Sequence, residues 1–425
     1  MNTYTDVEKK FHDLFSQTQN TAPSWHQKTR QLAFDTFKQQ GFPTRKVENW
    51  KYTSLAKLLA TEFETQQYQK TIDMNEINLP QLSCHRLVFI NGEIDQTLSD
   101  RTFPKGLKIE TLENTTFPLE KYFGKSIEAS RHPLANLNLA LANSGTIIHC
   151  EKNTKLEKPL HIIFIGAGKT EYNHYQLTLL DENAECDIIR QFVNTDKETQ
   201  FGNHINEVIL NNQSKHKIYN IQTNNRMSFH VDGIHVKQDE HSEFECITLD
   251  LGSQLSRTDI DVKLNGKHSR CTLNGFYYPT GKQHIDNHNR IDHCVAECQS
   301  SEIYKGILDD QGRAVFNGKI VIHQDAQKTQ THQLNKNLLL SNRCEIDTKP
   351  ELEIYADDVK ASHGATSGQL DKNALFYMQA RGISSDAAKQ LLIDAFSFDV
   401  LQTIQNKSIR KWFENCISTR EVDDE

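Results

Sequence analysis

The sequence lacks closely spaced cysteine pairs. Its nine cysteines stand at positions 84, 150, 186, 246, 271, 294, 298, 344 and 416, and none belongs to a Cys-x-x-Cys pair. A ferredoxin-like centre needs four closely arranged thiolates, so a self-contained centre of that kind is excluded. In a reducing compartment free cysteine packs as a small hydrophobe. We therefore expect these thiols to be reduced and mostly buried.

Long apolar runs and an excess of basic residues are missing too. The longest apolar stretch, residues 160–165, is far shorter than the roughly 20 residues of a membrane helix. The net charge of −8 argues against a nucleic-acid partner, which would require a concentrated basic face. Residues 1–15 contain three acidic side chains and no apolar core, unlike a signal peptide. These absences predict a cytoplasmic protein with neither a membrane nor a nucleic-acid partner.

A phosphate-binding loop is also missing, although residues 166–170 (GAGKT) resemble one. The motif requires a glycine five residues before the Gly-Lys-Thr triplet, and Ile163 stands there. The residues that follow, 175–180, have the pattern of a strand, whereas the motif needs a helix. We expect no nucleotide to bind this chain.

What the sequence does contain is a long region of short strands and polar turns, from about residue 146 to 354. Four similar strand–turn–strand segments begin at Leu180, Leu210, Val236 and Leu264, which are 30, 26 and 28 residues apart. A degenerate period of this length is typical of a solenoid, in which each turn of chain stacks on the last. An antiparallel sandwich also has regular turns, so the residues alone leave both folds open.

Helical patterns lie at both ends of this region. Residues 4–60 are expected to form helices, with a break at Pro23 and Ser24, and a helical insertion is expected near 133–143. After Gly368 we expect three helices, the first stopped by Gly382 and the second capped by Ser384 or Ser385. The predicted domains are therefore a helical domain at 1–84, a β domain at 85–368 and a helical domain at 369–425.

The densest group of potential metal ligands is His284, His288, His293, Cys294 and Cys298. On one strand, alternation would put His284 and His288 on one face and His293 on the other, so the group cannot converge. A hydrogen-bonded contact surface fits the intervening Asn and Asp residues better. A zinc site is the alternative.

A single histidine, His363, stands among residues of very small side chain at 361–366. A poorly shielded neutral imidazole is a ready ligand for iron, zinc or copper. Because no nucleophile–base pair accompanies it, we interpret His363 as one half of a shared site. A metal-dependent lyase or isomerase on a β-solenoid, using this histidine and the 284–298 group, remains the alternative function.

Several long motifs run through the chain in a fixed order. They are RKVENWKYT at 45–53, DNHNRIDH at 286–293, YKGILD at 304–309, RAVFNGK at 313–319, NKNLLLS at 335–341, DTKPELE at 347–353, and LFY at 375–377 with RGI at 381–383. Together they resemble the SufB/SufD family, the scaffold subunits of the Suf iron–sulfur cluster assembly machine. The SHGAT version at 362–366 and the lack of a cysteine cluster near the amino terminus resemble the SufD branch.

The resemblance implies a mainly β protein, a right-handed parallel β-helix flanked by N- and C-terminal helical domains. It also implies a non-catalytic scaffold that pairs with a SufB-like paralogue, docks a SufC-like ATPase through its carboxy-terminal helices and takes part in iron homeostasis; a homodimer is possible. The cargo would be a transient iron–sulfur cluster. Reduced flavin (FADH2) is associated with such complexes, but the sequence has no flavin motif.

The same resemblance assigns site residues. His363 would face a cysteine of the partner subunit and share the cluster with it, with His293 and Cys344 as secondary candidates for the metal. His288, Arg290 and Asp292 would contact the paralogue, and Phe396 and Trp412 would contact the ATPase. One position departs from the family: the residue two before the histidine, often cysteine, is Ala361.

Overall fold

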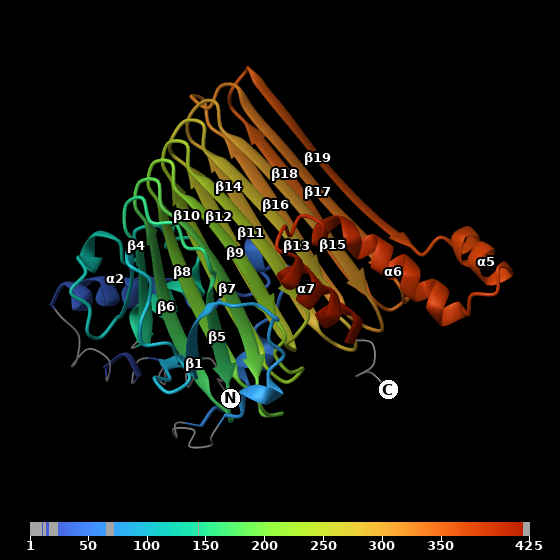
Figure 1. Cartoon of the computed structure of the whole chain (residues 1–425), viewed down its shortest axis with the longest axis horizontal. Helices are drawn as coiled ribbons and strands as arrows, with labels where there is room; N and C mark the ends of the chain where they lie inside the picture. Colours follow the sequence, from blue (N-terminus) through green and yellow to red (C-terminus); the bar gives the residue numbers. More distant parts are fainter. Residues whose placement is uncertain (1–10, 12–13, 17–23, 65–71, 143, 420–425) are drawn as a thin grey trace.

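The chain folds into a parallel β-solenoid (Figure 1). The computed structural model describes residues 11, 14–16, 24–64, 72–142 and 144–419. From β4 onward successive strands alternate between two sheets, so each turn of the chain adds one strand to each. Sheet A runs in the order β19 (Val359–Gln369), β17 (Thr329–Leu339), β15 (Gln299–Leu308), β13 (Arg270–Tyr277), β11 (Glu243–Asp250), β9 (Lys215–Gln222), β7 (Glu185–Asn194), β5 (Leu160–Gly166), β1 (His85–Ile90) and β2 (Glu93–Ile94). Sheet B runs in the order β18 (Glu345–Ile354), β16 (Arg313–Ile322), β14 (His284–His293), β12 (Leu255–Leu264), β10 (Phe229–Gln238), β8 (Phe201–Leu210), β6 (Glu171–Leu180), β4 (Ser144–Cys150) and β3 (Leu107–Thr111).

Helices cover the outer faces of both sheets. The α-helices are α2 (Ser24–Gln40), α3 (Ala56–Leu59), α4 (Pro133–Leu141), α5 (Lys372–Ala380), α6 (Ser385–Leu401) and α7 (Lys407–Thr419), and the 3-10 helices are η1 (Glu48–Trp50), η2 (Met74–Glu76) and η3 (Leu119–Lys121). Apolar side chains of α2 and α4 pack with the outer face of sheet B, and those of α6 and α7 pack with the outer face of sheet A. Within the described residues, no helix is long and apolar enough to cross a membrane.

The repeat of the solenoid is close to the one predicted. The register of sheet B advances from Glu171 to Phe201, Phe229 and Leu255, in steps of 30, 28 and 26 residues. Because these trunk strands pair in parallel, the solenoid is confirmed and the antiparallel sandwich is wrong.

One part of the predicted alignment is wrong by two residues. Leu180 does pair with Leu210, but Gln238 rather than Val236 stands opposite Leu210 on the next strand. Two residues along a strand return to the same face of the sheet. Alternation in the sequence therefore cannot detect a slip of two.

The turns stack because each places a left-handed residue at the same point. These residues lie 27 to 31 positions apart and are Asn153, Asn183, Gln213, His241, His268, Glu297 and Lys328. A left-handed backbone costs a non-glycine residue roughly 1–2 kcal/mol. The amide groups of Asn183, Gln213 and His241 donate to carbonyls of the following turn, at 3.0, 2.9 and 2.9 Å. Contacts between turns thus offset the strain, and a typical hydrogen bond contributes about 1 kcal/mol.

A buried ion pair joins the two sheets across the interior. Arg190 on β7 and Asp232 on β10 are both fully buried, and the guanidinium donates two hydrogen bonds to the carboxylate, at 2.7 and 2.9 Å. Breaking a buried pair of this kind typically costs about 3–5 kcal/mol because the remaining charge is left without a partner. Elsewhere the interior holds an apolar core that runs along the solenoid.

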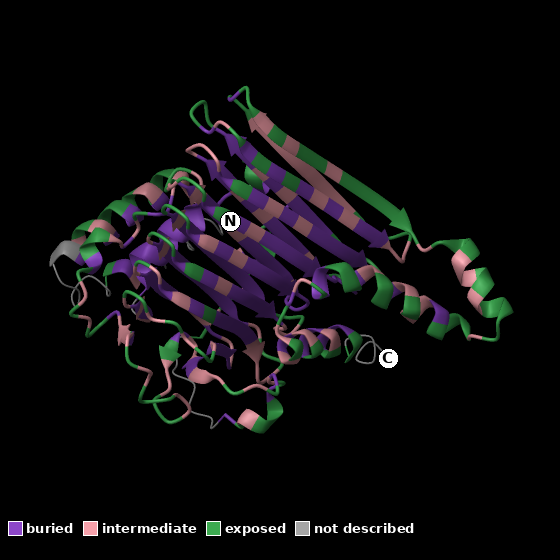
Figure 2. Ribbon diagram, turned by 45° about the horizontal axis from the view of Figure 1, so that its top comes forward, coloured by how far each residue is buried: buried purple, intermediate pink, exposed green. Residues whose placement is uncertain are grey.

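The two ends of the solenoid differ. At the amino-terminal end β2 and β3 pair antiparallel with β1 and β4, which ends the parallel ladder. At the other end β18 and β19 are the last strands, and within the described residues no strand pairs with their outer edges. Figure 2 shows β19 as a row of exposed and half-buried residues beside a buried trunk.

The predicted stop of the first carboxy-terminal helix is confirmed, since Gly382 has a φ of +88° after the end of α5. The Asp371 side chain, which was not predicted as a cap, accepts hydrogen bonds at the start of this helix. The Ser384 hydroxyl accepts from the Ala387 amide and caps α6. The third helix was expected to run from about Leu401 to Thr419, but Leu401 ends α6 and the chain breaks before α7 begins at Lys407. The helical segment predicted before Pro23 lies mostly outside the described residues.

Two further predictions about local structure are confirmed. The loop at 166–170 connects strand β5 to strand β6, so it lacks the helix that a phosphate-binding loop requires. All nine cysteines are free thiols and are buried or half-buried. Their burial fits cysteines that pack as small hydrophobes rather than ligands of a resident centre.

Candidate functional site

His363 lies in the middle of β19, the last strand of sheet A. In-register parallel strands put paired residues on the same face of the sheet. The column that ends in His363 contains, going inward along the sheet, Gln333, Glu302, Leu273 and Cys246. Leu273 and Cys246 belong to the interior core. The His363 side chain therefore belongs to the inward face of the strand. It is exposed because, among the described residues, no further turn covers it.

The strand that carries His363 was not predicted from sequence. Residues 361–368 are Ala, Ser, His, Gly, Ala, Thr, Ser and Gly, which are mostly poor strand formers. Pairing along the full length of β17 imposes the extended conformation. Small side chains leave the outer edge of the backbone accessible, so the histidine stands on an open strand edge.

A buried carboxyl lies two turns below His363. Glu302 is fully buried and accepts hydrogen bonds from the side-chain amides of Asn289 and Gln333, both at 2.6 Å. Burial raises the pKa of Glu302 to about 7, and the two amide hydrogen bonds oppose the shift. A Cβ at Gly318 would lie 2.2 Å from the Gln333 amide nitrogen, so only glycine admits this close approach. A polar layer thus separates His363 from the apolar core.

A second polar group continues this layer toward the far end of the strands. The Tyr277 hydroxyl donates to Asn337 Oδ1 at 2.5 Å, and the side-chain amides of Asn335 and Asn337 bond to each other at 2.7 Å. Thr348 of sheet B donates to Asn335 at 2.8 Å, which links the last turns of the two sheets. These bonds hold the open end of the solenoid in a defined shape.

The secondary metal candidates do not join His363. His293 is buried inside the solenoid, where its Nε2 shares a 2.9 Å hydrogen bond with the Ser300 hydroxyl, and burial lowers the pKa of His293 to about 4. The Cys344 thiol donates to the Ser341 carbonyl in the turn after β17. That turn follows Leu339, which pairs with Gln369. Six residues of strand, about 20 Å, separate Gln369 from His363.

The predicted contact residues His288, Arg290 and Asp292 share the outer face of β14. His288 bonds to Asp286 at 2.9 Å, and Arg290 makes a two-point ion pair with Asp292 at 2.6 and 2.8 Å. The prediction that His293 faces the other way is confirmed. Because β14 has a strand on each side, these residues do not lie at the open edge. The group at 284–298 therefore does not converge with His363 into the site that the lyase or isomerase alternative requires.

The two residues expected to contact the ATPase, Phe396 and Trp412, also pack within the chain. Trp412 is only 3% exposed and belongs to the core between α7 and sheet A. Phe396 is half-buried, and the ammonium of Lys305 lies 4.8 Å from the centre of its ring. The large apolar residues exposed on these helices are instead Phe376, Tyr377, Leu391 and Phe398.

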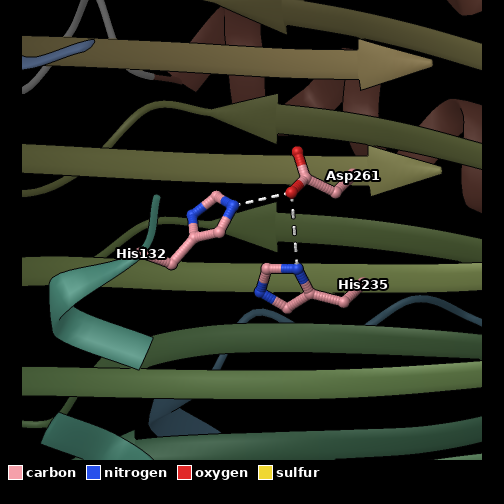
Figure 3. Close-up of side chains that lie close together, drawn as sticks. All are labelled: His132, His235 and Asp261. Carbon is pink, nitrogen blue, oxygen red and sulfur yellow. Dashed lines mark hydrogen bonds and ion pairs between the residues drawn. The ribbon is translucent and has the colours of Figure 1, made fainter. Parts of the chain in front are cut away.

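One cluster of potential metal ligands was not predicted from the sequence. His132, His235 and Asp261 converge on the outer face of sheet B (Figure 3). His235 and Asp261 are register partners on β10 and β12, 26 residues apart, so a correct alignment of the repeats would have paired them. No sequence signal connects His132, which precedes α4, with either residue.

The buried Glu302 gives a testable pH dependence. Its pKa is higher in the folded chain than in the unfolded one, so ionisation destabilises the fold progressively as pH rises from about 4.5 to 7. Glu302→Gln removes this penalty. We compare the free energy of unfolding of the variant with that of the wild type by urea titration at several pH values. Between pH 4.5 and pH 8 the difference should shift in favour of the variant by about 3 kcal/mol.

The control for this experiment is Glu240→Gln, since that side chain is 52% exposed. Measured at the same pH values, it shows what the loss of an exposed carboxylate does to stability. A Glu302→Gln difference from the wild type that does not change with pH would show that the carboxyl is not held in a raised-pKa environment.

Comparison with known proteins identifies the family of this chain. Residues 163–396 match the family described as "SUF system FeS cluster assembly, SufBD core domain", and residues 5–162 match "SufBD protein N-terminal region". The chain is 31% identical to the iron–sulfur cluster assembly protein SufD of Escherichia coli over 95% of its own length and 94% of that protein. It is 29% identical to an iron–sulfur cluster assembly SufBD family protein of Synechocystis, over 98% and 96% of the two chains. It is 23% identical to SufD of Bacillus subtilis over 99% of both. The chain therefore belongs to the SufBD family of iron–sulfur cluster assembly proteins and is a homologue of SufD.

Proposed function

We propose that this chain is a non-catalytic scaffold subunit that presents His363 as one ligand of a nascent iron–sulfur cluster shared with a SufB-like partner. The observation that carries the proposal is an exposed imidazole on the inward face of an end strand whose outer edge has no partner among the described residues. An imidazole with partner thiolates gives the mixed nitrogen and sulfur set that suits iron. The cluster is cargo that the pair builds and passes on.

The open strand edges support the pairing. β19 is eleven residues long and β18 is ten, and both end their sheets on the same side of the molecule. An exposed edge of this length presents unpaired backbone donors and acceptors that favour addition of another strand. A partner with two equivalent edges could extend both sheets at once. The SufB-like paralogue is the partner we propose, with a second copy of this chain as the alternative.

The sulfur ligands must come from that partner. Ala361, which packs against the interior core, replaces the thiol that the family often has two residues before the histidine. Cys344 lies too far along the strands to reach His363. On this proposal the chain supplies nitrogen, and the partner supplies the thiolate.

The carboxy-terminal helices are the proposed dock for a SufC-like ATPase. α5 has no buried residue and projects away from the trunk (Figure 1). Phe376 and Tyr377 of α5 are 72% and 59% exposed, and Leu391 and Phe398 of α6 are 47% and 50% exposed. Exposed aromatic and aliphatic side chains of this kind commonly anchor a protein interface. Movement driven by the ATPase would reach the open end through α6, which packs on β13 and β15.

The cluster role predicts the behaviour of His363→Ala. The exposed site should tolerate the change with less than about 0.5 kcal/mol of destabilisation. The variant should still assemble with the paralogue and the ATPase, and ATP hydrolysis should be unchanged. Cluster formation on anaerobic reconstitution, followed by visible absorption, should fall at least about tenfold. Replacing a residue that only hydrogen-bonds a metal ligand already lowers metal affinity by about that factor, and His363 is proposed to be a ligand itself.

A matched control stands one strand away. His332 on β17 is exposed and pairs with Ser362, the neighbour of His363 on β19. Its ring shares a 2.9 Å hydrogen bond with that serine, so His332→Ala removes an imidazole from the other face of the same edge. The control should build clusters normally. Wild-type cluster yields in His363→Ala would refute the ligand role.

The ATPase dock predicts a loss of binding in Phe376→Ser and Leu391→Ser. Each anchor typically contributes about 2 kcal/mol, so each change should weaken ATPase binding roughly 30-fold in calorimetry, while paralogue binding stays intact. Point variants are preferable to a truncation, because deleting α6 and α7 would uncover the core on sheet A.

Leu32→Ser serves as the control, since Leu32 is 68% exposed on α2, a helix that packs on sheet B. It should bind the ATPase as tightly as the wild type. If the two helix variants also bind normally, the dock lies elsewhere on the chain.

A further inference from the structure

Three side chains from separate parts of the chain meet beside the entry to α4. His132 caps that helix, His235 lies on β10, and Asp261 lies next to it on β12 (Figure 3). His132 Nε2 is 2.6 Å from Asp261 Oδ2, and His235 Nδ1 is 3.7 Å from the same oxygen. The three potential ligand atoms all lie within 4.8 Å of one another. Two imidazoles therefore point at one carboxylate oxygen.

His235 is not satisfied by this arrangement. The side chain is 1% exposed, and among the described residues neither ring nitrogen has a hydrogen-bond partner. Its approach to Asp261, at 3.7 Å, is beyond hydrogen-bonding reach. A buried polar group without a partner costs free energy, and such groups in native proteins are commonly explained by a bound ion or water. The ion pair with Asp261 reaches only Nδ1 of His235, at 3.7 Å, so among the described residues Nε2 of this buried ring is left without a partner.

We propose that His132, His235 and Asp261 bind one divalent transition-metal ion, Zn²⁺ or Fe²⁺. Two imidazoles and a carboxylate are a donor set that both ions accept. Ligands about 2.0–2.1 Å from a tetrahedral ion lie about 3.3 Å apart. The 3.7 Å contact is close to that value, and the 2.6 Å contact needs only a small withdrawal of the carboxylate. The metal replaces the proton shared by His132 and Asp261.

The surroundings supply the rest of a coordination shell. A cavity of about 20 Å³ borders His132 and His235, which is room for one water as a fourth ligand. Arg131 Nη2 donates to Asp261 Oδ2 at 2.5 Å and lies 3.3 Å from His132 Nε2, so the guanidinium would keep its bond to the carboxylate and move off the imidazole as the ion binds. The positive charge of Arg131 is itself compensated, since Glu128 lies 3.5 Å away.

This site is separate from the proposed cluster site. It lies on the outer face of sheet B under α4, whereas His363 stands on the last strand of sheet A. A resident ion would tie the segment before α4 to two strands of the trunk. The proposed metal site therefore does not depend on whether His363 is a cluster ligand.

The test is Zn²⁺ binding by the full-length chain without an affinity tag, after chelator treatment, measured by calorimetry with Zn²⁺ alone. We expect one tight site in the wild type. His235→Gln and Asp261→Asn should each weaken it at least 100-fold, and His363→Ala should leave it unchanged. X-ray absorption of the loaded wild type should show nitrogen and oxygen ligands near 2.0–2.1 Å and no sulfur near 2.3 Å.

Wild-type measurements decide the question even if the buried variants fail to fold. Saturating Zn²⁺ should raise the thermal midpoint of the wild type, and chelator should reverse the rise. No tight Zn²⁺ site, a sulfur shell, or equal binding by a folded Asp261→Asn variant would each overturn the proposal. Loss of Zn²⁺ binding in His363→Ala alone would place the ion at the open end instead.

Discussion

Backbone hydrogen bonding between successive turns is the constraint on which this structure depends. Every strand in the trunk satisfies its amide and carbonyl groups through the strands above and below it, at a register fixed by left-handed residues such as Asn183 and Gln213. The first and last strands of such a ladder each have an outer edge whose amide and carbonyl groups lack strand partners. Such an edge can be closed by antiparallel pairing, covered or left open, and the two ends of this solenoid differ in this respect.

At the amino-terminal end the parallel ladder is closed by the antiparallel strands β2 and β3. At the carboxy-terminal end the helices turn aside and cover the outer face of sheet A, so the edges of β18 and β19 stay free. The polar layer around Glu302 and Asn335 replaces apolar core just below this open end. His363 is the one imidazole placed on the inward face of the last strand. Its exposure follows from where the ladder stops.

Local rules in the sequence predicted much of this architecture. The cap at Ser384, the stop at Gly382 and the opposite facing of His288 and His293 each depend on neighbours within a few residues, and all are confirmed. The solenoid repeat was also visible, but its register was not, because a slip of two residues preserves the alternation of faces. The same ambiguity concealed the contact of His235 with Asp261.

The remaining differences come from contacts between distant parts of the chain. Strand β19 has a sequence that does not favour a strand, and β17 imposes the conformation on it. Trp412 was expected to be exposed and to contact a partner, but it packs against sheet A. The exposed aromatic residues Phe376 and Tyr377 of the carboxy-terminal helices could be identified only from the folded chain.

On the proposed function, the outer edge of β19 receives a strand of the partner, which brings His363 to a shared site. Amide hydrogen exchange of the peptide that spans Val359–Gln369 distinguishes a covered edge from an open one, in the isolated chain and in the complex with the SufB-like paralogue. We expect rapid exchange of the outward-pointing amides in the isolated chain and strong protection in the complex, with trunk strands such as β10 unchanged. Equal exchange of this peptide in the two states would refute strand addition at this edge.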